Sequence, residues 1–153
     1  MTWRLSSSVF RDGEHLPKSY SCEGADVSPP LAWIEPPPGT KNLALIVDDP
    51  DAPGRTWVRW VLYNLPSQTP GLPEHVPNET TLQTGAFQGV NDFGHVGYGG
   101  PCPPPGAPHR YVFTLYALDE PVILPPRAIK AQLEQAMTGH ILAQARLIGL
   151  YKR

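Results

Sequence analysis

Three long hydrophobic runs predict the main strands of the fold. Residues 43–47 are continuously apolar and end at Asp48, which is typical of a strand covered on both faces. The runs over 57–65 and 110–118 have the same character and are also predicted to be strands. Turn-forming residues separate the runs. Weaker strands are predicted near residues 6–10, 32–33 and 84–89.

Alternation along two of these runs predicts which side chains share a face, because successive side chains of a strand point in opposite directions. One face of the run 57–65 is assigned Trp57, Arg59, Val61 and Tyr63, and the other Val58, Trp60 and Leu62. In the third run, the shared face carries His109, Tyr111, Phe113 and Leu115. Polar groups are thereby placed on faces that are otherwise apolar.

The C-terminal third has a helical pattern instead. Pro126 suits the first turn of a helix whose apolar residues recur at Ile129, Leu133, Ala136 and Met137. Gly139 is expected to end this helix, and Thr138 to cap a second short one that begins at His140. The second helix would bury Ile141, Leu142, Ala145 and Ile148 and end at Gly149, with 150–153 returning as an edge strand. The residues therefore predict one β-rich domain over 1–153, with helices late in the chain.

The composition narrows the class of protein. The chain has 153 residues, which suits one domain with a hydrophobic core. A formal net charge of −2 and the lack of a basic run argue against a nucleic-acid partner. The first residues lack the apolar segment of a signal peptide, and no apolar stretch approaches the roughly 20 residues of a membrane span. We therefore expect a soluble, cytoplasmic protein that is not an integral membrane protein.

Cys22 and Cys102 both fall in loop-like sequence. For a cytoplasmic protein, the favoured interpretation is two reduced thiols, and a disulfide between the two loops is the main alternative. Their spacing does not show whether they lie within bonding distance. No metal is expected, because two thiols without histidine or cysteine at finger spacing do not make a tetrahedral shell.

The segment 48–53 places two carboxylates between prolines, directly after the first predicted strand. Pro50 restricts Asp49 to an extended conformation. The Asp49 carboxylate can then accept a hydrogen bond from a ligand ammonium, or orient a neighbouring histidine. The alternative is a turn in which aspartates cap local amides, and for Asp51 we favour this role.

A second proline-rich loop, residues 99–106, leads into His109 and Tyr111. These two residues are two apart on a strand, so they project from one face with roughly 6.6 Å between them. An imidazole and a phenol can both donate to an oxyanion such as phosphate or a carboxylate. The prolines of the loop would form a wall beside them. The alternative is a buried His–Tyr pair that is satisfied internally.

Arg59 is the odd residue in an apolar, aromatic run, so it must be paired or reach a wet cavity. It could clamp an anion, with Trp57 as a stacking surface, or form an ion pair with Asp49 or another carboxylate, and we slightly favour the ion pair. The other loop histidines, His15, His75 and His95, are expected to be solvated. The sequence has no Gly-x-Ser-x-Gly elbow, His-Glu-x-x-His motif or P-loop, which disfavours the common hydrolases and nucleotide sites.

Together these motifs resemble the phosphatidylethanolamine-binding protein family, in particular its bacterial and archaeal Raf kinase inhibitor-like branch. The resemblance runs nearly end to end, through blocks at 20–24, 28–33, 49–53, 57–65, 91–94, 97–106, 109–111 and 139–143. It implies a mainly β fold, a β-sandwich of a large central sheet and a smaller sheet with short peripheral helices. It also implies an anion pocket between the two proline loops, whose matching positions are Asp49, Pro50, Pro103, Pro104, His109 and Tyr111.

Two departures from the family pattern bear on this pocket. The family usually has a histidine where this chain has Arg59, and the loop 103–108 is one residue longer. Arginine does not lose its charge near neutral pH, whereas histidine does. Arg59 therefore either strengthens oxyanion binding or folds onto Asp49 and fills the pocket.

The resemblance implies a non-enzymatic binding protein without a cofactor. Its ligand would be phosphate, phosphorylethanolamine or a similar small anion, and it would modulate a kinase or protease partner, as a homodimer. One alternative is a protein inhibitor that acts through its surface, with the pocket incidental. The other is a hydrolase in which His109 is the acid or base and Asp49 orients it.

Overall fold

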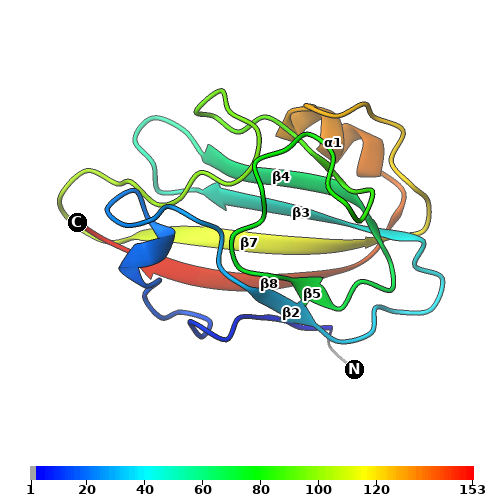
Figure 1. The fold of residues 1–153 in the computed structure, drawn as a ribbon, viewed down its shortest axis with the longest axis horizontal. Helices are drawn as coiled ribbons and strands as arrows, with labels where there is room; N and C mark the ends of the chain where they lie inside the picture. Colours follow the sequence, from blue (N-terminus) through cyan, green and yellow to red (C-terminus); the bar gives the residue numbers. More distant parts are fainter. Residues whose placement is uncertain (1–2) are drawn as a thin grey trace.

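A central antiparallel sheet of five strands forms the larger layer of the molecule. The computed structural model describes residues 3–153. The strand order is β6–β4–β3–β7–β8. These strands are β3 (Asn42–Asp49), β4 (Trp57–Pro66), β6 (Phe87–Gln88), β7 (His109–Leu118) and β8 (Ile141–Tyr151). The end of β3 and the start of β7 lie at the same end of the sheet, the left end in Figure 1.

A smaller antiparallel sheet packs on one face of the larger one. It consists of β1 (Leu5–Ser6), β2 (Leu31–Trp33) and β5 (Gly71–Leu72), in the order β1–β2–β5. A short 3-10 helix, η1 (Lys18–Tyr20), precedes β2, and the α-helix α1 (Lys130–Met137) precedes β8. The expected mainly β fold with a large and a small sheet is thus confirmed.

Two hydrophobic clusters lie on the two faces of the larger sheet. The cluster between the sheets joins residues of the smaller sheet to Leu45, Trp60 and Phe113 of the larger one. Fully removing a side chain of this size from water contributes about 1.5–3 kcal/mol. The second cluster packs Leu133 and Met137 of α1 against residues of the opposite face, which include Ala44, Ile46, Val61 and Tyr63. The polar end of β3, β4 and β7 is therefore held by a core on both sides.

The helix α1 agrees only in part with the sequence prediction. Leu133 and Met137 are buried as expected, and Gly139 follows the helix with φ +84°, a conformation that glycine adopts readily. The helix begins at Lys130, however, so Pro126 lies in the preceding turn and not in the first turn. The prediction for Ile129 was also wrong, because its side chain is 50% exposed.

The second predicted helix is wrong, because residues 141–151 form the strand β8. This strand pairs with β7 along its whole length, and its burial alternates: Ala145 and Leu147 are buried, whereas Gln144 and Arg146 are exposed. Helix-forming residues made the segment ambiguous, and pairing with a long neighbour outweighs local propensity. Thr138 therefore caps no second helix, and His140 lies in the turn, where its Nδ1 is 2.9 Å from Asp119 Oδ1.

Gly149 does not end a helix either. It lies within β8, where a Cβ atom would come within 2.8 Å of Leu16 Cγ and 3.0 Å of Phe10 Cε2. Because glycine has no side chain, the segment that contains Phe10 and Leu16 can pack closely against β8.

The face assignment on β4 fails for Arg59 and also for Val58, which packs with Val61 and not with Trp60, for a reason that matters to the site. In the register with β3, Val47 pairs with Trp60 and Asp48 with Val58, so Arg59 is an extra residue in the strand. Such a β-bulge re-aims the side chain that it contains. Arg59 therefore does not share a face with Val61, which packs toward α1.

No helix within residues 3–153 is long and apolar enough to cross a membrane. The same residues contain no group of three or more His, Cys, Asp or Glu side chains that could hold a metal ion.

Candidate functional site

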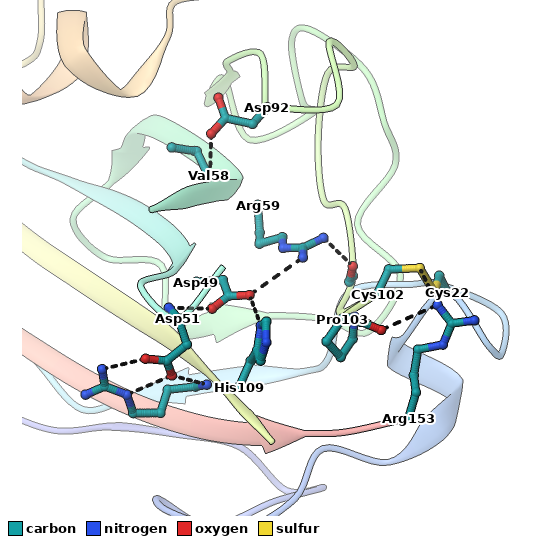
Figure 2. A network of polar contacts seen from close by, with 12 residues as sticks. Cys22, Asp49, Asp51, Val58, Arg59, Asp92, Cys102, Pro103, His109 and Arg153 are labelled. Atoms are coloured by element: carbon teal, nitrogen blue, oxygen red, sulfur yellow. Dashed lines mark hydrogen bonds and ion pairs between the residues drawn. A yellow bond between two sulfur atoms is a disulfide. The ribbon is translucent and has the colours of Figure 1, made fainter. Parts of the chain in front are cut away.

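The candidate site begins with Asp49 at the end of β3 and His109 at the start of β7. His109 Nδ1 lies 2.8 Å from Asp49 Oδ2, which joins residues sixty positions apart (Figure 2). Because a carboxylate only accepts, we place the proton of this hydrogen bond on Nδ1. Asp49 is fully buried and also accepts the backbone N–H of Asp51 through Oδ1 at 2.8 Å. The carboxylate thus both orients the imidazole and closes the local turn.

Arg59 lies beside this pair because the bulge in β4 directs it there. Its Nη2 is 3.9 Å from Asp49 Oδ2, and its Nη1 donates to the carbonyl of Gly100 at 2.9 Å (Figure 2). The guanidinium carbon lies 5.0 Å from the ring centre of Phe93 and 5.5 Å from that of Tyr111. Both ring faces attract a cation. Burial lowers the pKa of the guanidinium, and the neighbouring Tyr111 and Asp49 oppose that shift.

Tyr111 completes the polar group on the face between the two sheets. Its ring lies nearly parallel to that of His109, at 22° and 6.5 Å between ring centres, as expected for two positions on one face of a strand. The residue is 1% exposed. Burial raises the pKa of its hydroxyl, and the nearby Asp49 carboxylate raises it further. The phenol therefore stays protonated and able to donate.

Several buried donors at this end of the sheet have no protein partner. Within residues 3–153, four buried side-chain polar atoms lack a hydrogen bond. Three of them are Trp57 Nε1, Arg59 Nε and Tyr111 Oη, and Trp57 is the residue paired with Asp49 in the β3–β4 ladder. Buried donors are rarely left unsatisfied, so an unpaired group calls for an explanation. This cluster has donors to offer a ligand.

The expectation that Asp51 caps local amides was wrong. Its carboxylate accepts the backbone N–H of Arg110 at 2.8 Å and forms two further contacts with the Arg110 guanidinium, at 2.8 and 2.9 Å. Hydrogen bonding from Arg110 lowers the pKa of Asp51 to about 2. It is Asp49 that accepts the local amide. Asp51 therefore ties the first proline turn to β7.

The three prolines predicted to line the pocket differ in burial. Pro103 is buried, whereas Pro104 and Pro50 are exposed. Arg153 Nη1 donates to the carbonyl of Pro103 at 3.4 Å, so the segment that follows β8 contacts the same loop (Figure 2). Of the predicted wall, Pro103 is the residue packed into the structure.

The expectation of two reduced thiols was wrong, because Cys22 and Cys102 form a disulfide with Cα atoms 5.4 Å apart. Neighbouring contacts bring the two loops together: the backbone N–H of Cys22 donates to Pro101 O at 3.0 Å, and Tyr98 Oη donates to Tyr20 O at 2.8 Å. These contacts join segments far apart in the chain, so cysteine spacing carried no sign of them. The bridge fixes the loop that supplies Pro103.

Sequence reasoning missed Gly100 and Phe93. Gly100 contributes a backbone carbonyl, which no residue pattern reveals. A Cβ at Gly100 would lie 2.3 Å from both Tyr20 O and Asp26 Oδ1, so the position requires glycine. Phe93 lies in the block 91–94 that carries the family resemblance, but no role was assigned to it; its ring covers Arg59, and the residue is 43% exposed.

Comparison with known proteins places this chain and its fold in one family. The family model described as phosphatidylethanolamine-binding protein matches residues 6–152. A "UPF0098 protein" of Methanothermobacter thermautotrophicus is 50% identical over 149 residues, which cover 97% of this chain and 98% of that one. A protein of the same description from Aquifex aeolicus is 52% identical over 149 residues, covering 96% and 86%.

Two solved structures agree with this result. A putative phosphatidylethanolamine-binding protein homologue of Chlamydia trachomatis, CT736, has a TM-score of 0.90 and 41% identity, covering 99% of this chain and 98% of the other. Escherichia coli YbcL, described as a member of the mammalian PEBP family, has a TM-score of 0.92 and 36% identity, covering 100% and 99%. The chain belongs to the phosphatidylethanolamine-binding protein family.

Proposed function

We propose that the cluster of Asp49, Arg59, His109 and Tyr111 binds a small oxyanion of the phosphate class, and that the protein is a non-enzymatic binding protein. The observation that carries this proposal is the set of buried donors without partners, Arg59 Nε and Tyr111 Oη above all. An oxyanion presents several acceptor oxygens at once and would satisfy both. Phosphate and phosphorylethanolamine are the ligands that we consider first.

The net charge of the cluster depends on His109. Asp49 and Arg59 offset one another at 3.9 Å, so the state of His109 sets the remaining charge. With Nδ1–H directed at Asp49, a neutral imidazole presents Nε2 as an acceptor, which disfavours an oxyanion. A protonated imidazole presents Nε2–H as a donor and adds a positive charge. Binding should therefore be stronger in acid, and Arg59 should keep a part of it in alkali.

The His109–Asp49 pair could also serve a hydrolase, in which an acid or base is held by a carboxylate. We do not favour that use. In the part of the chain that the structure describes, the hydrogen bonds of the His109 imidazole include no serine, threonine or cysteine that could act as a nucleophile. We therefore propose recognition without turnover, with a kinase or protease as the partner whose activity ligand binding would modulate.

Isothermal titration calorimetry with inorganic phosphate and with phosphorylethanolamine tests the proposal. We expect saturable binding of both compounds to the wild-type protein. The variants Arg59→Ala and His109→Ala should each weaken it, whereas Lys41→Ala, which removes an exposed charge elsewhere, should not. Absence of binding heat for both compounds from acid to alkaline pH would reject the proposed function.

A further inference from the structure

A polar hollow outside the Asp49 cluster is lined by residues that the proposed function does not use. Its volume is about 430 Å³. The residues around it are Asn78, Thr80, Gly94, His95, Val96 and Arg127. Their polar side chains comprise an amide, a hydroxyl, an imidazole and a guanidinium, and no carboxylate lies among them. A hollow of this make-up offers donors and positive charge.

Arg127 lies in this hollow with an unusual backbone conformation, φ +73°. Within residues 3–153, the other non-glycine residues with positive φ are Asp26, Asn64 and His75. Those three residue types adopt this region more readily than a long side chain such as arginine. Strained backbone of this kind gathers at binding sites.

The surroundings of Arg127 hold it in that conformation. Its backbone N–H donates to Gln88 O at 3.0 Å, and the next residue, Ala128, accepts from Val90 N at 3.0 Å. Ala128 also donates its N–H to Tyr63 Oη at 3.1 Å. Across the part of the chain that the structure describes, Arg127 takes part in no salt bridge. The backbone of Arg127 is thus held in place, and the side chain is exposed and available to a ligand.

The opposite side of the hollow is also held firmly. Asn91 Oδ1 accepts the backbone N–H groups of Phe93 and His95, at 3.0 and 3.2 Å, and its Nδ2 donates to Gly97 O at 2.9 Å. Gly97 has φ +99°, and a Cβ there would lie 2.5 Å from Asn78 Oδ1. Asn78 can thus approach the 94–97 backbone only because residue 97 is glycine. The loop that presents His95 is packed, not loose.

We propose that this hollow is a second anion site, which takes an oxyanion such as phosphate, sulfate or a carboxylate. Arg127 supplies a permanent positive charge and paired N–H donors, which suit oxyanions. Thr80 and Asn78 can add neutral donors, and His95 adds a second positive charge when it is protonated. The site shares no residue with the Asp49 cluster, although Phe93 and His95 come from the same loop.

Titration with inorganic phosphate, followed by NMR of the histidine imidazoles, tests this second site. The His95 signals are assigned with the variant His95→Gln. In the wild-type protein, we expect a saturable shift at His95. The variant Arg127→Gly should weaken that response about tenfold or more, because a charge-assisted hydrogen bond is lost. Glycine suits φ +73°, so this variant should fold, and thermal melting checks that it does.

Control experiments distinguish binding at this second site from binding at the Asp49 cluster. The variant Lys41→Ala, which removes an equal charge elsewhere on the surface, should leave the His95 response unchanged. Acetate in place of phosphate should also shift His95, if more weakly. No saturable shift at His95, or an equal shift in Arg127→Gly, overturns the second site. Failure of the Asp49 cluster shows separately, as an absent response at His109.

Discussion

The imidazole of His109 and the carboxylate of Asp49 form a 2.8 Å hydrogen bond across the end of two neighbouring strands. Asp49 ends β3 and His109 begins β7, each strand continues into a proline-containing loop, and both loops lie at the same end of the sheet. Because Asp49 fixes which nitrogen carries the proton, the charge of His109 decides whether Nε2 donates or accepts. The following predictions start from this relationship.

Phosphate affinity should depend on pH through His109. We expect the affinity to be higher in acid than in alkali. A protonated imidazole presents an extra donor and an extra positive charge, so the affinity falls as the pH rises. Calorimetric titrations across the pH range measure the difference. In His109→Gln the pH dependence should largely vanish; an unchanged dependence in that variant would assign it to another group.

Arg59 should bind the anion by its geometry as well as by its charge. Arg59→Ala should weaken phosphate binding by about tenfold or more, since hydrogen bonds to charged groups contribute about 1.5–3 kcal/mol. Arg59→Lys keeps the charge but loses the planar set of donors and the stacking between Phe93 and Tyr111, so it should restore only part of the affinity. If Arg59→Ala bound phosphate more tightly than the wild type, the guanidinium would be an obstacle and not a ligand.

The disulfide should contribute substantially to stability. Cys22 and Cys102 are 80 positions apart, so the bridge closes a long loop in the unfolded chain. Replacing both by serine should lower the free energy of unfolding by about 2–5 kcal/mol. Urea denaturation with and without a reducing agent measures the loss. The reductant should have no effect on the Cys22→Ser/Cys102→Ser variant, and an equal effect there would point to a cause other than this bridge.

The Asp51–Arg110 pair should make stability fall in acid. Hydrogen bonding from Arg110 lowers the pKa of Asp51 from 3.8 to about 2, so the folded state binds this proton more weakly than the unfolded state. The contribution is therefore present above about pH 4 and is lost as the pH falls toward 2. Asp51→Asn should lower the urea midpoint at pH 7 and match the wild type near pH 2. A midpoint difference that is the same at both pH values would contradict this.

The sequence predicted the parts of the fold that its periodicity encodes. The three long strands and the apolar face of α1 at Leu133 and Met137 were predicted, because burial on a strand or helix face repeats along the chain. The two-sheet architecture was implied by the family resemblance and not by the pattern of residues. The sequence prediction failed for β8, where alanine, glutamine and leucine suit either structure. There the long neighbour β7 decides the conformation, and no local pattern reports that pairing.

The candidate site shows the same division. His109 and Tyr111 were placed on one face by simple alternation, and the structure agrees. Arg59 could not be placed in this way, because it is the extra residue of a β-bulge in β4, and the bulge interrupts the alternation of side chains there. The disulfide and the Gly100 carbonyl depend on contacts between distant loops, and these do not appear in residue spacing.

A crystal structure of the protein grown in saturating phosphate tests the central claim most directly. The account predicts density for an oxyanion bordered by Pro103 and the His109 ring, with oxygens at about 2.7–3.2 Å from Arg59 Nε and Tyr111 Oη. Density for an ordered water network that satisfies both atoms, with no anion at this end of the sheet, would contradict it.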